Sequence, residues 1–147
     1  MGYYVHIEEC LVHIPKSEFA NACRHLEQIG FLTDTENMNG GRFSEGERTY
    51  WYSWVDMDML KEKIHGGDLP GVLHLFGFDA EFDKVDGFLE CLMYEGKSGD
   101  EEHLLRCLAP FFADGNYIEW QGEEGDRWRC VFEKGEMNLV SPTILWK

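Results

Sequence analysis

Apolar and polar residues alternate near both ends of the chain, and this alternation predicts β-strands there. From Tyr3 to Ile14 the apolar positions change phase beside Glu8 and Glu9, which a regular period of two does not allow. We therefore expect a β-bulge at these two glutamates. The last third of the chain predicts three more strands, at 116–121, at 127–133 and from Met137 until Pro142 ends it.

A helical period appears between these ends. Its longest run goes from Phe19 to Ile29, with Ser17 as the expected N-cap and Gly30 directly after the helix. Three shorter helices are predicted, from Asp56 or Asp58 to His65, from Asp68 to Phe76, and from Asp100 to a last turn that Pro110 shortens.

Residues 33–48 have no periodicity and contain two adjacent glycines, so we expect a mobile loop. The following stretch, 49–55, is dense in large aromatic residues on both phases, which indicates a central strand.

Two hairpins follow from turn chemistry. Phe78, Ala80 and Phe82 alternate with acidic residues, and Asp86-Gly87 connects this strand to another over 88–94. In the second hairpin, a three-residue loop ending at Gly125 would place Glu119 opposite Arg129 and Gln121 opposite Arg127.

These elements predict a single α+β domain over residues 1–147, with a mostly antiparallel sheet and helices packed on one face. The length suits one core, and 44% hydrophobic residues are enough to build it. No repeat, low-complexity tract or linker marks a second domain.

The composition indicates a cytoplasmic protein. No apolar run approaches the roughly 20 residues of a membrane-spanning helix, and the first residues lack the pattern of a signal peptide. Five widely spaced cysteines, an odd number, lie within apolar patterns, so we expect reduced core thiols. No cofactor motif is present, and the oligomeric state is left open.

The net charge of −15, from 28 acidic and 13 basic residues, opposes direct binding to nucleic acid or anionic lipid. It fits either a surface that only keeps the protein dispersed or one that recognises a basic partner.

Some residues could carry chemistry. His6, Glu8 and Cys10, with His13 nearby, would share one side of a regular strand, but the expected bulge turns them apart and no paired short cysteine spacing supports zinc. His103 and Cys107 are four residues apart on a helix and could form a thiol with its base. Glu90 and Glu119 could lie on adjacent strands as an acid and base pair. For each set the ordinary structural role is favoured, and no metal site is predicted.

The densest charge lies between Asp79 and Glu102, where nine acidic residues meet two basic ones. The sequence therefore predicts a non-enzymatic acidic binding protein that engages a basic, nucleic-acid-binding protein surface, as an inhibitor or regulator would. The expected partner-binding residues are Asp79, Glu81, Asp83, Asp86, Asp100, Glu101 and Glu102. The alternative is a small metal-dependent or hydrolytic enzyme that uses His6, Glu8 and Cys10, or His103 and Cys107.

The run Asp114-Gly115-Asn116-Tyr117-Ile118-Glu119-Trp120-Gln121-Gly122-Glu123-Glu124-Gly125, followed by Trp128 and Phe132, resembles a segment of small hypothetical proteins of bacteria and their phages. A first strand like Tyr4–Cys10 is similar too. The resemblance implies an intracellular bacterial or phage origin. It brings no activity and no site residue.

Overall fold

A computed structural model describes residues 2–143, 145 and 146. Its main sheet is antiparallel and five-stranded, in the order β6-β1-β7-β8-β9, and two smaller two-stranded sheets pair β2 with β3 and β4 with β5. The strands are β1 (Tyr4–Leu11), β2 (Gly40–Ser44), β3 (Glu47–Trp51), β4 (Asp79–Phe82), β5 (Leu89–Met93), β6 (Glu95–Lys97), β7 (Tyr117–Gly122), β8 (Arg127–Glu133) and β9 (Glu136–Val140). The helices are α1 (Phe19–Gln28), α2 (Met57–His65), α3 (Leu69–Leu75) and α4 (Glu101–Cys107).

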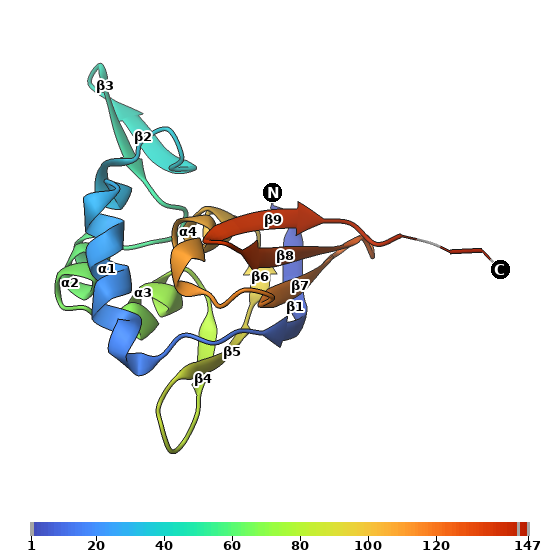
Figure 1. Cartoon of the computed structure of the whole chain (residues 1–147). Coiled ribbons are helices and arrows are strands. Elements are labelled where there is room, and N and C mark those ends of the chain that lie inside the picture. Colours follow the sequence, from blue (N-terminus) through green and yellow to red (C-terminus); the bar gives the residue numbers. More distant parts are fainter. Residues whose placement is uncertain (1, 144, 147) are drawn as a thin grey trace.

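The helices lie to one side of the main sheet, and the N-terminal end of the chain lies beside the sheet (Figure 1). One face of the sheet carries Ile118, Trp120 and Phe132, which are buried in a single hydrophobic cluster together with helix residues such as Leu26 and Leu104. The architecture is therefore the α+β domain that the sequence predicts, with an antiparallel sheet and helices on one face.

The strands of the main sheet agree most closely with those predicted from the sequence. The pairing of β1 with β7 shifts between Ile7 and Glu9, so the bulge is confirmed. Strands β7 and β8 pair Glu119 with Arg129 and Gln121 with Arg127, as predicted. Gly125 has φ +86°, the left-handed conformation that the three-residue loop requires.

Most helix ends also agree with the sequence. Asp56 accepts backbone N–H bonds at the start of α2, and Asp68 does so at the start of α3. Gly30 has φ +76° just after α1. The predicted N-cap Ser17 is wrong: it lies inside a 3-10 turn, Lys16–Glu18, and Glu18 takes the cap position without a side-chain bond.

The β2–β3 hairpin overturns the prediction of a central strand at 49–55. β3 ends at Trp51 and, among the described strands, pairs with β2 alone, and residues 41–50 are exposed. Glu45 and Gly46 have φ +52° and +80°, the two positive values of a tight hairpin turn. Half of the expected loop at 33–48 is therefore regular structure, projecting away from the helices (Figure 1).

Among the described residues, no helix combines the length and the apolar character needed to cross a membrane.

Candidate binding surface

The β4–β5 hairpin sorts its side chains by the alternation that the sequence shows. Strand pairing places Ala80 opposite Leu92, and Leu92 is fully buried. The neighbouring positions on β4, Asp79 and Glu81, are exposed and lie opposite Met93 and Cys91. Since successive side chains of a strand point to opposite faces, both carboxylates face away from the core.

The end of the hairpin is held by Asp83. Its carboxylate accepts N–H bonds from Val85 at 3.0 Å and Asp86 at 2.6 Å, which is an Asx-type turn. Gly87, at φ +72°, follows the turn. Asp83 is thus a half-buried turn residue, whereas Asp86 beside it is exposed. Phe82, predicted to face inward, is 36% exposed and reaches only the rim of the core, with its ring centroid 6.1 Å from that of Phe19.

Asp100 and Glu101 do not belong to an exposed surface, which corrects the sequence-based prediction. Only 3% of Asp100 and 4% of Glu101 is exposed. Asp100 accepts bonds from the backbone N–H of Ser53 and from the backbone and side chain of Asn39.

Glu101 accepts bonds from the Ser98 hydroxyl and the Gly99 backbone N–H. Both carboxylates satisfy buried donors of nearby loops, because such donors are costly to leave unpaired. Of the three acidic residues at the start of α4, Glu102 is the exposed one.

The carboxylates that remain on the hairpin lack cationic partners. None of Asp79, Glu81, Asp86 and Glu90 takes part in an ion pair within the described part of the chain, and all four are exposed. Val85 at the tip is 89% exposed and Met93 is 47% exposed. We call these six residues the acidic hairpin surface, and it combines uncompensated negative charge with exposed apolar side chains. The hairpin projects from the body of the molecule (Figure 1).

The ligand set suggested for a metal at the first strand is not assembled. His6 Nε2 lies 3.2 Å from Glu8 Oε2, so these two do meet. Cys10 lies beyond the bulge, and its sulfur accepts the backbone N–H of Leu92 at 3.4 Å. Burial raises the pKa of the Cys10 thiol to about 12. No group of three potential metal-binding side chains occurs within the described residues.

His103 and Cys107 meet as the helical spacing predicts. The Cys107 sulfur lies 3.8 Å from His103 Nε2, and the same nitrogen lies 3.1 Å from Asp34 Oδ2. The sequence does not predict the contact of His103 with Asp34, because Asp34 lies in the segment predicted to be a loop, far from α4 in sequence.

This trio is not arranged as a nucleophile with its base. One ring nitrogen faces both the thiol and the carboxylate, whereas a catalytic histidine uses one nitrogen for each. Burial raises the pKa of the Cys107 thiol to about 11, so it stays protonated at neutral pH. The His103 ring also stacks on the buried Phe31 at 5.6 Å between centroids, which fits a packing role.

Glu90 and Glu119 are not neighbours across a sheet. Glu90 lies on β5 and Glu119 on β7, in different sheets. The proposed acid and base pair is therefore wrong.

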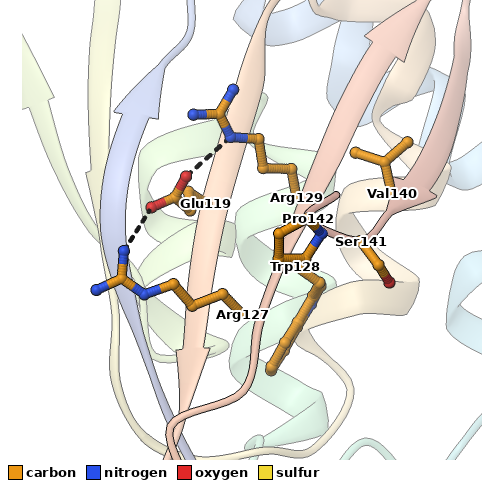
Figure 2. A pocket seen from close by; sticks show the side chains of 7 residues that line it. All are labelled: Glu119, Arg127, Trp128, Arg129, Val140, Ser141 and Pro142. Atoms are coloured by element: carbon orange, nitrogen blue, oxygen red, sulfur yellow. Dashed lines mark hydrogen bonds and ion pairs between the residues drawn. The ribbon is translucent and has the colours of Figure 1, made fainter. Parts of the chain in front are cut away.

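Glu119 belongs instead to the uncovered face of the main sheet. It lies between two arginines, with Arg129 Nε at 2.9 Å and Arg127 Nη1 at 3.8 Å (Figure 2). Together with Trp128 and the chain after β9, these residues line a hollow of about 360 Å³. Glu8 also pairs with Arg127, at 3.8 Å. Each guanidinium is matched by a carboxylate, so the hollow presents no excess of positive charge.

Comparison with models of protein families, with curated proteins and with solved structures gave no match to this chain.

Proposed function

We propose that this protein is a binding protein without catalytic activity, which uses the acidic hairpin surface to engage a basic surface of a nucleic-acid-binding protein. The observation that carries the proposal is the absence of cationic partners for its exposed carboxylates within the described residues. On the β7–β8 hairpin, by contrast, the outward Glu119 is paired with Arg129.

Uncompensated charge of this kind acts mainly on the encounter between proteins. A net charge of −15 raises the local concentration of cationic partners, and carboxylates on a projecting hairpin are the first groups such a partner meets. The exposed Val85 and Met93 then offer apolar contact once the charges have aligned. A partner that normally holds phosphates would lose access to them, so the expected role is that of an inhibitor or regulator. The resemblance to bacterial and phage proteins is consistent with this role.

The test compares two variants that lose the same charge from different places. The hairpin variant carries Asp79→Asn, Glu81→Gln and Asp86→Asn. The control carries Glu36→Gln, Asp58→Asn and Glu62→Gln, three exposed residues outside the hairpin. Neither set takes part in an ion pair or a side-chain hydrogen bond through its carboxylates in the described residues. The probe is a fluorescent arginine-rich peptide, followed by stopped flow with and without competing duplex DNA.

At low salt, the hairpin variant should associate several-fold more slowly than the control variant, and the difference should shrink as salt shortens the Debye length. Duplex DNA should compete more effectively for the peptide against the hairpin variant than against the control. If both variants associate at equal rates at every ionic strength, only the net charge of the protein matters and the acidic hairpin surface serves solubility. The proposal would then be abandoned.

A further inference from the structure

A groove beside the sheet edge formed by β6 is the second feature that points to a ligand, and it lies outside the acidic hairpin surface. Its volume is about 450 Å³, and its lining comes from β1, the segment after β3, the end of α3 and β6. Trp54 and Tyr4 are the prominent aromatic residues of the lining, 66% and 51% exposed. Exposed aromatic rings beside a hollow are typical of binding surfaces.

The backbone at Trp54 is strained. Its φ is +60°, which is uncommon for any residue with a side chain and an outlier for a bulky one. Such a conformation is unfavourable and persists only where the surroundings impose it.

Here the surroundings are the two buried carboxylates. Asp100 accepts the N–H of Ser53, directly before Trp54. Glu101 accepts the N–H of Gly99, and the Trp54 ring lies so close to Gly99 that a Cβ there would be 2.7 Å from it. Asp100 and Glu101 thus hold the tryptophan in an exposed position rather than facing a partner themselves.

The groove runs along a free strand edge. Within the part of the chain that the structure describes, β6 pairs with β1 alone, with Gly96 opposite Val5. The hydrogen bonds on either side, from Ile7 N–H to the Tyr94 carbonyl and from Ser98 N–H to the Tyr3 carbonyl, fix which residues of β6 point toward β1. By the alternation of an antiparallel ladder, the N–H groups of Glu95 and Lys97 point away from it. Neither N–H takes part in a hydrogen bond outside the strand ladders of the described residues, whereas the Lys97 carbonyl on the same edge accepts a hydrogen bond from the Tyr94 hydroxyl.

Open space lies over the middle of this edge. A Cβ at Gly96 would have no heavy atom within 4 Å, and Gly96 has no positive φ that would require glycine. A strand normally disfavours glycine, since it adds backbone freedom and packs nothing. Because a Cβ stands perpendicular to the sheet, the uncovered glycine keeps the groove open over the face of β6, next to its free edge, where a side chain of the added strand can lie.

Within the groove the charge of Glu95 is balanced by that of Lys97, so the preference for a cationic side chain comes from the aromatic lining and from the net charge of the chain. Lys97 Nζ already lies 5.9 Å from the centre of the Tyr4 ring, which leaves Trp54 as the uncovered aromatic face. Glu95 is exposed and has no ion-pair partner in the described residues, and the chain as a whole carries −15. An arginine is suited to stack on a tryptophan while it bonds to a carboxylate.

We propose that the groove binds an extended, arginine-containing peptide segment of a partner protein, which adds a strand to the free edge of β6 and places its arginine on Trp54 beside Glu95. Backbone bonds to the outward N–H groups of Glu95 and Lys97 supply general affinity, and the aromatic wall supplies the preference for arginine. This site is separate from the acidic hairpin surface, so it stands if the proposed function of that surface fails.

The test begins with a library of linear ten-residue peptides displayed on phage and selected on the wild-type protein. The enriched sequence is then synthesised, and its dissociation constant is measured by fluorescence anisotropy for the wild type and for five variants. Lys97→Pro removes the outward N–H of an edge strand, where proline is tolerated, and Lys97→Ala is its control because it loses the side chain but keeps the N–H. Gly96→Val fills the open space, and Trp54→Ala removes the aromatic wall.

Phe43→Ala removes an aromatic residue that is 68% exposed on the β2–β3 hairpin and serves as the remote control. The selected peptides should share an arginine. Lys97→Pro and Gly96→Val should each weaken binding at least tenfold and Trp54→Ala at least fivefold, whereas Lys97→Ala and Phe43→Ala should stay within twofold of the wild type. Gly96→Val should also unfold at the wild-type temperature or above, since valine suits a strand better than glycine.

The proposal is overturned if no peptide is enriched, or if the enriched peptides lack arginine. It is equally overturned if Gly96→Val binds like the wild type. If Lys97→Pro and Lys97→Ala behave alike, the peptide does not add a strand and the backbone part of the proposal is wrong.

Discussion

The hairpins β7–β8 and β4–β5 have the same antiparallel form but treat their outward charges in opposite ways. In β7–β8 the outward Glu119 lies between Arg127 and Arg129, and the inward residues Ile118 and Phe132 are fully buried. In β4–β5 the outward Asp79 and Glu81 have no cation beside them in the described residues, and the hairpin belongs to a sheet of only two strands.

The difference separates two uses of a carboxylate. A residue matched within the fold contributes to stability, whereas one left unmatched contributes little and its charge stays available to another molecule. The outward charge of β7–β8 is thus used inside the fold, whereas that of β4–β5 is unmatched within the described residues.

The largest expected effect concerns the core side of the two hairpins. Trp120 of β7 is 3% exposed and packs against Tyr94 and Phe78, so Trp120→Ala should lower the free energy of unfolding by about 3–5 kcal/mol. Phe82→Ala, in the rim position of β4, should cost only about 1 kcal/mol. Urea unfolding followed by circular dichroism measures both. Similar costs for the two would mean that β4–β5 is anchored in the core as firmly as β7–β8.

The same two hairpins should also differ in the reactivity of their cysteine thiols. Cys130 of β8 is 1% exposed and burial raises its pKa to about 12, so its thiol should stay protonated and protected even at pH 9. Cys91 of β5 is partly exposed. In native protein Cys91 should react with a maleimide at least tenfold faster than Cys130, as measured by mass spectrometry of the digested protein. An equal rate of labelling would contradict the burial of Cys130. All five thiols should react once the protein is unfolded.

The turn of β7–β8 should show a smaller cost. Gly125→Ala should destabilise the protein by about 1 kcal/mol, because a Cβ is unfavourable at φ +86°. The added Cβ would contact no heavy atom within 4 Å, so the loss reflects the backbone alone. Glu124→Ala, in the same loop but without a positive φ, is the control and should change the urea midpoint little. A neutral Gly125→Ala would mean that another loop conformation is accessible.

The smallest effects on stability are expected from variants that remove a single carboxylate charge from one of the hairpins. Glu119→Gln should destabilise by about 1 kcal/mol, since it weakens a charged bond to Arg129 at a position where the Glu119 side chain is only 16% exposed. Glu81→Gln should be neutral or stabilise by up to about 0.5 kcal/mol, because it removes a charge from a crowded acidic region. Thermal unfolding at low salt measures both changes. If Glu81→Gln destabilises as much as Glu119→Gln, then Glu81 has a partner inside the fold and the contrast between the hairpins disappears.

The strands and turns whose side chains follow a local period can be predicted from the sequence alone. The bulge beside Glu8 and Glu9, the register that joins Glu119 to Arg129, and the helix starts at Asp56 and Asp68 are all correct. Each depends on neighbours within about ten residues, where steric and turn preferences act without help from distant parts of the chain. The acidic character of β4–β5 can be predicted from the sequence for the same reason.

Which groups face solvent and which distant residues meet depends on how the whole chain packs. The aromatic stretch after Arg48 has large residues on both phases, like a central strand, but among the described strands it pairs with β2 alone and forms an exposed hairpin. Asp100 and Glu101 have the composition of a surface cluster, yet loops 61 and 47 residues away in sequence bring Asn39 and Ser53 to Asp100. Burial and hydrogen bonding between such distant segments are properties of the packed chain, since they depend on where every other element lies. That is why the carboxylates that support Trp54 could not be told in advance from those that remain free on the acidic hairpin surface.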